Sequence, residues 1–375
     1  RFVLDLCRYL SDHADIKVLA PHTAGAEPEE VVEGVRVRRF RYFIEPWQSI
    51  AYQGGMAAKI RARPIRVVQL PFFFAALWWS TFRSVREWKP DVIHAHWIIP
   101  QGLAACLAVG GRLPILCTSH GGDLQYLKST FLQRVKAWAL RRCRRITVVS
   151  RSMLPEVEAL APRVPVDVIP MGTDLSTQFV PPERSQERDE DEIIFVGRLV
   201  ETKGIRYLLD AFSVLHQKMP RVKLTIVGDG PSRQDLTEHA RRLGIVDRIT
   251  FLGGLPHRDL PALYQRAAAA VFPFVQEGFG LVVVEAMGCG CPVIVSDIPA
   301  MQETVVPDVT GIVTPPEDPE ALARSIERCL CDESLRSRLA GSGLAAVRDR
   351  FDWSSITRAY LQVIHDCMQV ERTAI

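Results

Sequence analysis

The stretch AAVFPFVQEGFGLVVVEAMGCG, residues 269–290, joins an apolar run to a helical pattern through a glycine-containing loop. The run AAVFPF is typical of a buried central strand in a parallel sheet. We expect the following helix to begin near Gly280 or Leu281 and to end around Gly288, because glycines commonly follow a last helical turn. The stretch therefore predicts one strand–loop–helix unit of an α/β fold.

Two carboxylates frame this helix start, Glu277 and Glu285, eight residues apart. A helix N-terminus offers free N–H groups and a positive dipole end, and glycines allow a ligand to approach the backbone, so a diphosphate would fit. Helical side chains lean toward the N-terminus, so Glu285 would face the ligand and accept hydrogen bonds from hydroxyls such as a ribose diol. Glu277 would reach a hydroxylated group on the other side. Alternatively, both are ordinary solvated charges.

The same alternation of strand and helix patterns runs along the chain, which predicts parallel sheets with crossover helices. Since 375 residues exceed what one hydrophobic core usually covers, we expect two α/β domains in tandem. We place an N-terminal domain at 1–180, a polar linker at 181–192, a C-terminal domain at 193–350 and a last helix at 351–375. The expected strands are 16–20, 91–96, 114–120, 146–150, 166–170, 192–198, 223–230, 248–254, 269–274 and 292–297.

The ends and the linker raise separate points. The chain opens in a helical pattern, so we expect a first strand and its following loop to be missing. The acidic residues 189–191 are interpreted as linker charge rather than as metal ligands. The last helix, with Trp353, is expected to cross back onto the N-terminal domain, or simply to cap the C-terminal one.

Charge is distributed unevenly. Residues 1–180 contain 24 Lys+Arg and 15 Asp+Glu, a net charge of +9, whereas residues 181–375 contain 22 and 28, a net charge of −6. The first half is therefore expected to meet something anionic. No nucleic-acid motif accompanies this charge, so nucleic acid is not an expected partner. The nine cysteines have no metal-like spacing and are expected to be free thiols in a reducing compartment.

Arginines alternate with aromatic residues between positions 35 and 90. One interpretation is a peripheral membrane surface, with cations for anionic lipid and aromatics for the interface. The other is a partly buried helix with charged edges, and we expect residues 71–82, PFFFAALWWSTF, to be mostly core. No signal peptide is evident, and the longest apolar stretches fall short of the ~20 residues that a spanning helix needs, so we expect a soluble or peripheral protein.

A pair of cations follows another predicted strand end. VGRLVETKG, residues 196–204, places Arg198 and Lys203 where they could neutralise a diphosphate, although a surface pair beside a helix start would look the same. VGDGP, residues 227–231, is a further glycine turn after a strand and is weak by itself.

Together these motifs resemble the C-terminal domain of the family-4 glycosyltransferases, which have the two-domain GT-B fold of facing Rossmann-like sheets. The resemblance covers residues 193–345 through VGRLVETKG, IVGDGP, the E-x7-E stretch and GIVTPPEDPEALA. It extends into residues 1–180 through PDVIHAHW, TSHGGD, VVSRSM and VIPMGTD, where Met171 stands in place of the asparagine that many family members have.

The resemblance implies a retaining, hexosyl-type glycosyltransferase that uses a nucleotide-diphospho-sugar such as a UDP- or GDP-sugar. The acceptor would be a glycan or a lipid-linked group in polysaccharide or cell-envelope biosynthesis, handled in the cytoplasm or at the inner face of the membrane. No metal cofactor is expected. Alternatives are an epimerase or a phosphorylase of the same fold, or an inactive nucleotide-binding protein if the first loop is missing.

The resemblance also assigns residues. Glu277 would hold the donor sugar and His120 would lie near the reacting centre, so these two form the predicted catalytic set, with His94 and His96 ranked below His120. The predicted donor-binding set is Arg198, Lys203, Gly278, Phe279, Gly280, Leu281, Val282 and Glu285.

Overall fold

The structure is a computed structural model that describes residues 2–45, 47–52, 56, 59–60, 63–125, 129–183 and 188–369. The chain divides into two compact units. The first comprises Arg1–Val149, Met153–Ile169 and Thr357–Ile375, and the second comprises Ser150–Ser152 and Pro170–Ile356.

The strands of the first unit form two sheets. In the smaller sheet, β1 (Lys17–Pro21) runs parallel to β3 (Val35–Phe40), and β2 (Glu29–Val32) runs antiparallel to β3. The larger sheet is parallel throughout, with strand order β4-β5-β6-β7. Its strands are β4 (Ile93–His96), β5 (Ile115–Ser119), β6 (Arg145–Val148) and β7 (Val166–Val168).

The β2–β3 hairpin is absent from the strands expected on sequence. Val35 and Val37 are buried while Arg36 between them is exposed, which is the period of two that a half-buried strand requires. The segment was interpreted from the charge of its arginines, and the alternation of buried and exposed residues was not recognised. The smaller sheet is consequently mixed, not parallel.

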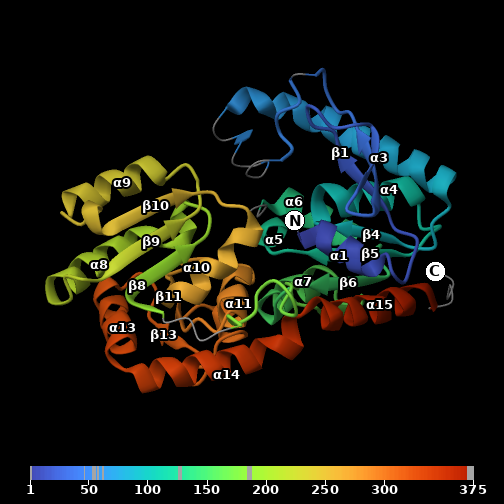
Figure 1. Cartoon of the computed structure of the whole chain (residues 1–375). Coiled ribbons are helices and arrows are strands. Elements are labelled where there is room, and N and C mark those ends of the chain that lie inside the picture. The colour runs from blue at the N-terminus through green and yellow to red at the C-terminus, as the bar shows by residue number, and fades with distance from the viewer. Residues whose placement is uncertain are drawn as a thin grey trace. The chain divides into compact units, whose positions relative to one another are not determined.

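Helices surround these sheets (Figure 1). They are α1 (Phe2–Leu10), η1 (Pro64–Val68), α3 (Gln69–Trp88), η2 (Ile98–Gly102), α4 (Leu103–Val109), α5 (Gly122–Gln125), α6 (Thr130–Leu140), η3 (Arg151–Met153), whose first two residues belong to the second unit, and α7 (Leu154–Leu160).

Helix α3 departs from the expectation that residues 71–82 are mostly core. Only one side of it, with Phe73 and Leu77, is buried in a cluster with Phe40 and Tyr42. Its outer side stays exposed, because one α-helical face contacts the rest of the unit and the opposite face does not.

The second unit contains one parallel six-stranded sheet with the order β10-β9-β8-β11-β12-β13. The strands are β8 (Asp189–Val196), β9 (Lys223–Val227), β10 (Ile249–Gly253), β11 (Ala267–Phe272), β12 (Val293–Ser296) and β13 (Ile312–Thr314). All six residues of β11 are buried, which is why this strand is a continuous apolar run.

Helices connect and cover the strands of this sheet. They are η4 (Glu201–Lys203), α8 (Ile205–Lys218), α9 (Arg233–Arg242), η5 (Val246–Arg248), η6 (His257–Asp259), α10 (Leu260–Arg266), α11 (Leu281–Gly288), α12 (Pro299–Gln302), α13 (Pro319–Cys331) and α14 (Glu333–Phe351).

The segment expected to be a linker ends in a strand. We expected residues 189–191 to belong to the linker, but β8 begins at Asp189. Asp189 pairs with Ala267 of β11. Residues 184–187 of the expected linker lie outside the described residues. Glu192 is buried and accepts hydrogen bonds from Arg266 and Thr225, which satisfies a carboxylate that a solvated linker would have left in water.

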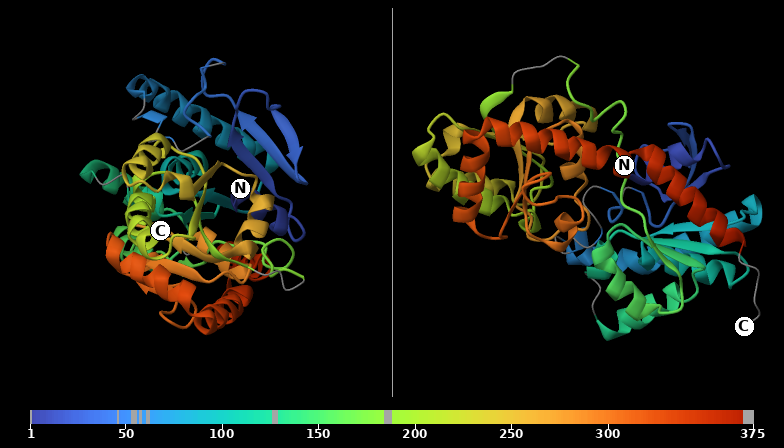
Figure 2. Two further views of the ribbon diagram at one scale, coloured as in Figure 1. Left: turned by 60° about the vertical axis from the view of Figure 1, so that its left-hand side comes forward. Right: turned by 90° about the horizontal axis from the view of Figure 1, so that it is seen from below.

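The last helix, α15 (Trp353–Gln369), contributes to both units, because residues from Thr357 onward belong to the first (Figure 2). Trp353 is 3% exposed and lies against Gly172, where an added Cβ would stand 2.8 Å from the indole ring. In the first unit Tyr360 is fully buried, and its ring lies 5.4 Å from that of His94. Residues on one helix thus complete two hydrophobic cores.

All nine cysteines are free, as expected from their spacing. Seven of them are buried, and burial raises the pKa of the Cys291 thiol to about 11. Buried thiols with raised pKa values are poor nucleophiles, so they act as packing residues.

Candidate active site

The loop after β11 leads into α11, which begins at Leu281 and ends at Gly288, in agreement with the predicted start near Gly280 or Leu281 and end around Gly288. Gly280 caps this helix with a φ of +83°, and a Cβ there would lie 2.4 Å from Met301 Cε. The positive φ favours glycine here, whereas the end of the Met301 side chain could shift to make room for a Cβ. The N–H groups of Leu281 and Val282 lie in the first turn, where a helix provides no internal acceptor for them.

Lys203 and Glu277 form an ion pair, with Lys203 Nζ against Glu277 Oε2. Both side chains are mostly buried, with exposed fractions of 19% and 17%. Lys203 Nζ also lies 4.4 Å from the centre of the Phe274 ring, and Glu277 Oε1 accepts a hydrogen bond of 2.8 Å from the Gly278 N–H. The sequence predicted different ligand groups for the two residues, whereas the structure joins them in one pair at the start of α11.

Backbone contacts hold this pair in place. The Thr202 carbonyl accepts hydrogen bonds from the N–H groups of Val275 and Gln276, at 3.0 and 3.1 Å. Gly204, at φ +66°, ends η4, and a Cβ at this position would lie 1.8 Å from the Pro273 carbonyl oxygen. This close approach of two backbones brings η4 against the end of β11, and with it Lys203 against Glu277.

Glu285 lies in α11 and is 2% exposed. Its Oε1 accepts a hydrogen bond of 2.8 Å from His257 Nε2, while its Oε2 is buried and has no hydrogen-bond partner among the described residues. Gln178 Nε2 lies 3.2 Å from His257 Nδ1. The Nδ1 atom of His257 therefore faces an amide donor, and its Nε2 atom faces a carboxylate acceptor. A buried carboxylate oxygen without a donor is costly, which suits a site that a ligand hydroxyl completes.

Sequence reasoning missed His257 and Gln178. His257 follows the predicted strand that became β10, in LPHRDL, and its position after a strand end was an available signal. No sequence signal pointed to Gln178, because it lies 79 residues from His257 and only the fold brings the two together.

Arg198 is exposed in the loop after β8. The Leu199 N–H of this loop donates to the Asp229 carbonyl at 3.0 Å, which joins it to the turn after β9. Gly228 in that turn has a φ of +135°, and a Cβ there would lie 1.8 Å from the Gly197 carbonyl oxygen. The glycine turn at residues 227–231, which by itself was only weak evidence for a ligand site, therefore allows the loops after β8 and β9 to contact each other.

His120, like the lower-ranked His94 and His96, belongs to the first unit, whereas the other predicted site residues belong to the second. It follows β5, and its Nε2 lies 3.1 Å from His96 Nδ1, with His94 next to His96 at a ring distance of 4.2 Å. Burial lowers the pKa of His94 to about 3 and that of His120 to about 4, and it holds the pKa of His96 well below its usual range. Within the described ranges, no group of three or more His, Cys, Asp or Glu side chains could hold a metal ion.

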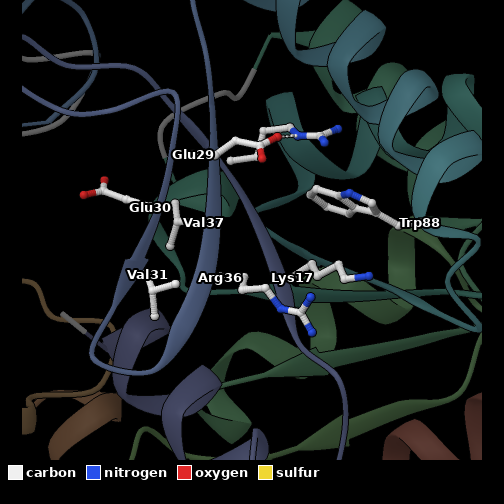
Figure 3. A pocket seen from close by; sticks show the side chains of 8 residues that line it. Lys17, Glu29, Glu30, Val31, Arg36, Val37 and Trp88 are labelled. Atoms are coloured by element: carbon white, nitrogen blue, oxygen red, sulfur yellow. Dashed lines mark hydrogen bonds and ion pairs between the residues drawn. The ribbon is translucent and has the colours of Figure 1, made fainter.

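The first unit also has a pocket on its smaller sheet (Figure 3). Arg38 lies in it with Glu29 at 2.6 Å, and the Trp88 ring lies 4.7 Å from the Arg38 guanidinium. The other charged lining residues pair with side chains outside the pocket, Lys17 and Arg36 with Asp15 and Glu30 with Arg39. None of the predicted site residues lines it. The lining residues are Lys17, Glu29, Glu30, Val31, Arg36, Val37, Arg38 and Trp88.

Family profiles match both halves of the chain. Residues 1–177 match the profile described as Glycosyltransferase Family 4, and residues 178–343 match Glycosyl transferases group 1. The chain is 30% identical to the glycogen synthase of Mycobacterium tuberculosis, over 96% of this chain and 88% of that protein. It is 29% identical to the D-inositol 3-phosphate glycosyltransferase of Frankia alni, over 82% of each.

The chain belongs to glycosyltransferase family 4. Solved structures agree with the GT-B fold. Sucrose-phosphate synthase from Thermosynechococcus elongatus superposes with a TM-score of 0.78 at 25% identity, over 97% of this chain and 92% of that one. The Anabaena protein HepE, solved with UDP, superposes with a TM-score of 0.75 at 21% identity, over 97% and 96%. This protein is therefore an enzyme of the glycosyltransferase class.

Proposed function

We propose that this glycosyltransferase moves a sugar from a nucleoside-diphosphate sugar to a hydroxylated acceptor, with retention of configuration. The observation that carries the proposal is the Glu285 carboxylate, which is buried, held on Oε1 by His257 and short of a donor on Oε2. A ribose hydroxyl would supply that donor.

In this proposal the diphosphate binds at the start of α11. The N–H groups of Leu281 and Val282 point their positive ends to the phosphates, and Lys203 and Arg198 add two charges, while the backbone of Gly278, Phe279 and Gly280 lies beside the sugar. Lys203 has three N–H donors, so it can keep Glu277 and still bind a phosphate oxygen. Glu277 then holds the sugar hydroxyls.

The chemical demand in such a transfer is stabilisation of the departing diphosphate, and fixed cations and a helix N-terminus meet it without a protein nucleophile. His120 would act near the reacting centre. Its pKa of about 4 keeps the ring neutral at neutral pH, so it could accept a hydrogen bond from a sugar hydroxyl. No metal ion is needed in this scheme.

A uridine donor is supported by the relative HepE, which was solved with UDP and with UDP-glucose. Relatives with glycogen and D-inositol 3-phosphate in their names support a polyhydroxylated acceptor. We infer a cytoplasmic reaction on a glycan or on a lipid-linked acceptor at the inner face of a membrane. A donor screen that measures released nucleoside diphosphate would identify base and sugar.

The ribose assignment is tested by calorimetry with UDP and 2′,3′-dideoxy-UDP. We expect the wild-type protein to bind UDP about 10- to 100-fold more tightly, since hydrogen bonds to a charged group contribute about 1.5–3 kcal/mol. In Glu285→Gln this preference should fall to a few-fold. The exposed α9 variant Glu238→Gln is the matched control and should keep the full preference. An undiminished preference in Glu285→Gln would reject the assignment.

A further inference from the structure

The outer side of the helix pair η1–α3 exposes large apolar side chains. Phe72 and Trp79 are 54% and 56% exposed, and Trp78 is 37% exposed. Trp79 and Phe82 stack at a ring distance of 5.7 Å. We call this surface the aromatic face; it consists of the exposed Ile65, Val68, Phe72, Trp78 and Trp79 and of Phe82, which is partly buried against Trp79. In Figures 1 and 2, α3 lies at the edge of the first unit.

The stretch of sequence that carries the aromatic face is rich in basic residues. Residues 46–86 contain six Lys and Arg residues and no Asp or Glu. The Arg86 guanidinium lies 4.3 Å from the centre of the Phe82 ring, so charge and aromatic surface are in contact. Glu87, one residue beyond this stretch, is already paired with Arg83 and Arg38. A partner for this face should therefore be apolar in part and negatively charged.

Spanning a membrane does not fit this helix. By length and composition, Pro64–Trp88 could cross a bilayer, which the sequence reasoning had excluded, and 17% of its most apolar window is buried. However, Phe73 and Leu77 pack into the core of the first unit with Phe40 and Tyr42. Insertion across a bilayer would break that core, whereas lying along the surface would leave it intact.

A second copy of this chain is also a poor partner. If two α3 helices paired through this face about a two-fold axis, the Arg63–Arg66 end of one would meet the Arg83–Arg86 end of the other. Cations would then face cations, and the carboxylate beside them, Glu87, is already shared by Arg83 and Arg38. An anionic lipid surface has the opposite charge and accepts Trp and Phe at its interface.

We propose that the aromatic face of η1–α3 adsorbs in the plane of an anionic membrane surface, with its aromatic side chains in the interface and its arginines on lipid phosphates. This goes beyond the donor site, and it would keep the first unit next to a lipid-linked acceptor. Membrane binding and donor binding are separate measurements, so failure of one leaves the other standing.

The test is co-sedimentation of the full chain with vesicles of phosphatidylcholine alone or with 30% phosphatidylglycerol, on the order of the charge of a cytoplasmic leaflet. We expect clear binding only to the anionic vesicles. Phe72→Ser with Trp79→Ser should weaken it by at least about tenfold. Arg63→Gln and Arg86→Gln should each weaken it by about fivefold and reduce its salt dependence.

Matched controls come from other exposed positions. Phe131→Ser removes a 73% exposed phenylalanine of α6, and Arg241→Gln with Arg242→Gln removes exposed arginines of α9, and neither variant should change vesicle binding. Far-UV circular dichroism verifies folding of each variant. Quenching of wild-type tryptophan fluorescence by brominated lipids, weaker in Trp79→Phe, gives a second readout that needs no destabilising change.

Three outcomes would overturn the proposal. These are no wild-type binding to anionic vesicles, equal binding by the Phe72→Ser, Trp79→Ser variant, and a concentration-dependent dimer that this variant dissociates while vesicle binding is absent. The last outcome would assign the face to a second copy of the chain.

Discussion

At the residue scale, the E-x7-E stretch predicted that Glu277 and Glu285 lie on either side of a helix start, but it did not predict their partners. Lys203 contacts Glu277 across 74 residues of sequence, and Glu285 contacts His257 across 28. The residue types and their place after strand ends were readable, because strand ends and glycine turns leave local patterns. The contacts between these residues could not be predicted, because a short stretch of sequence carries no information on which distant loop approaches it.

The Lys203–Glu277 pair predicts effects of opposite sign. Lys203→Met should weaken nucleoside diphosphate binding about 10- to 100-fold, because it removes a charge-assisted hydrogen bond worth about 1.5–3 kcal/mol. Glu277→Gln should leave diphosphate binding unchanged or slightly tighter, since it removes a negative charge, while lowering sugar transfer. Calorimetry with UDP and a turnover assay with the identified donor measure the two effects.

The exposed pair Lys218–Glu327, at 2.8 Å in the same unit, is the control for this experiment. Lys218→Met and Glu327→Gln should alter neither binding nor turnover, because exposed ion pairs contribute little. Weaker diphosphate binding in Glu277→Gln would contradict the assigned roles.

At the element scale, the strands of the second unit were predicted to within a few residues, except for β8 and β13. β11 and β12 are apolar runs bounded by turn residues, and such runs identify buried strands. β8 begins at Asp189, earlier than expected, because its acidic start has no strand pattern. β13 has only three residues, too few for any pattern to show.

Two glycines separate the effect of backbone conformation from that of close packing. Gly204 and Gly244 have φ values of +66° and +71°, but only Gly204 has a backbone atom, the Pro273 carbonyl oxygen, in the path of a Cβ. Gly244→Ala should lower the free energy of unfolding by about 1–2 kcal/mol through conformation alone. Gly204→Ala should lower it by about a further 1–3 kcal/mol and weaken diphosphate binding, because η4 carries Lys203.

Urea denaturation and UDP calorimetry on both variants measure these quantities. Equal losses of stability, with unchanged UDP affinity in Gly204→Ala, would show that the η4–β11 approach does not position Lys203.

At the scale of the whole molecule, chain length and the alternation of strand and helix patterns predicted two α/β domains. The chain divides into two compact units, and family profiles meet between residues 177 and 178. The division of the first unit into two sheets was not predicted, because strand patterns do not specify which strands pair. The surface character of α3 was also missed, since an apolar helix has the same composition whether it faces a core or a lipid surface.

The histidine cluster of the first unit predicts acid sensitivity. Burial lowers the pKa of His94 to about 3 and of His120 to about 4, from an ordinary 6.5. The unfolded chain therefore binds more protons than the folded one, so this stability is complete above about pH 6.5 and is lost as the pH falls toward 4. The free energy of unfolding should fall by up to about 1.4 kcal/mol per pH unit for each histidine.

Urea denaturation between pH 7.5 and 5 measures this dependence. His94→Asn removes one titrating group while keeping a polar side chain near Thr118, so its stability should fall less steeply. His13→Asn, at an exposed position, should keep the wild-type slope. A wild-type slope in His94→Asn would contradict the prediction.

The sequence by itself determined the tandem α/β architecture, the strand–loop–helix unit around Gly280 and the family, because hydrophobic period, glycines and motif spacing are local properties of the chain. Tertiary structure decided which charges meet: Lys203 with Glu277, and His257 with Glu285. It also decided that Phe72 and Trp79 face outward. The physical reason is that pairing and exposure depend on the packing of segments distant in sequence, and no local pattern encodes that packing.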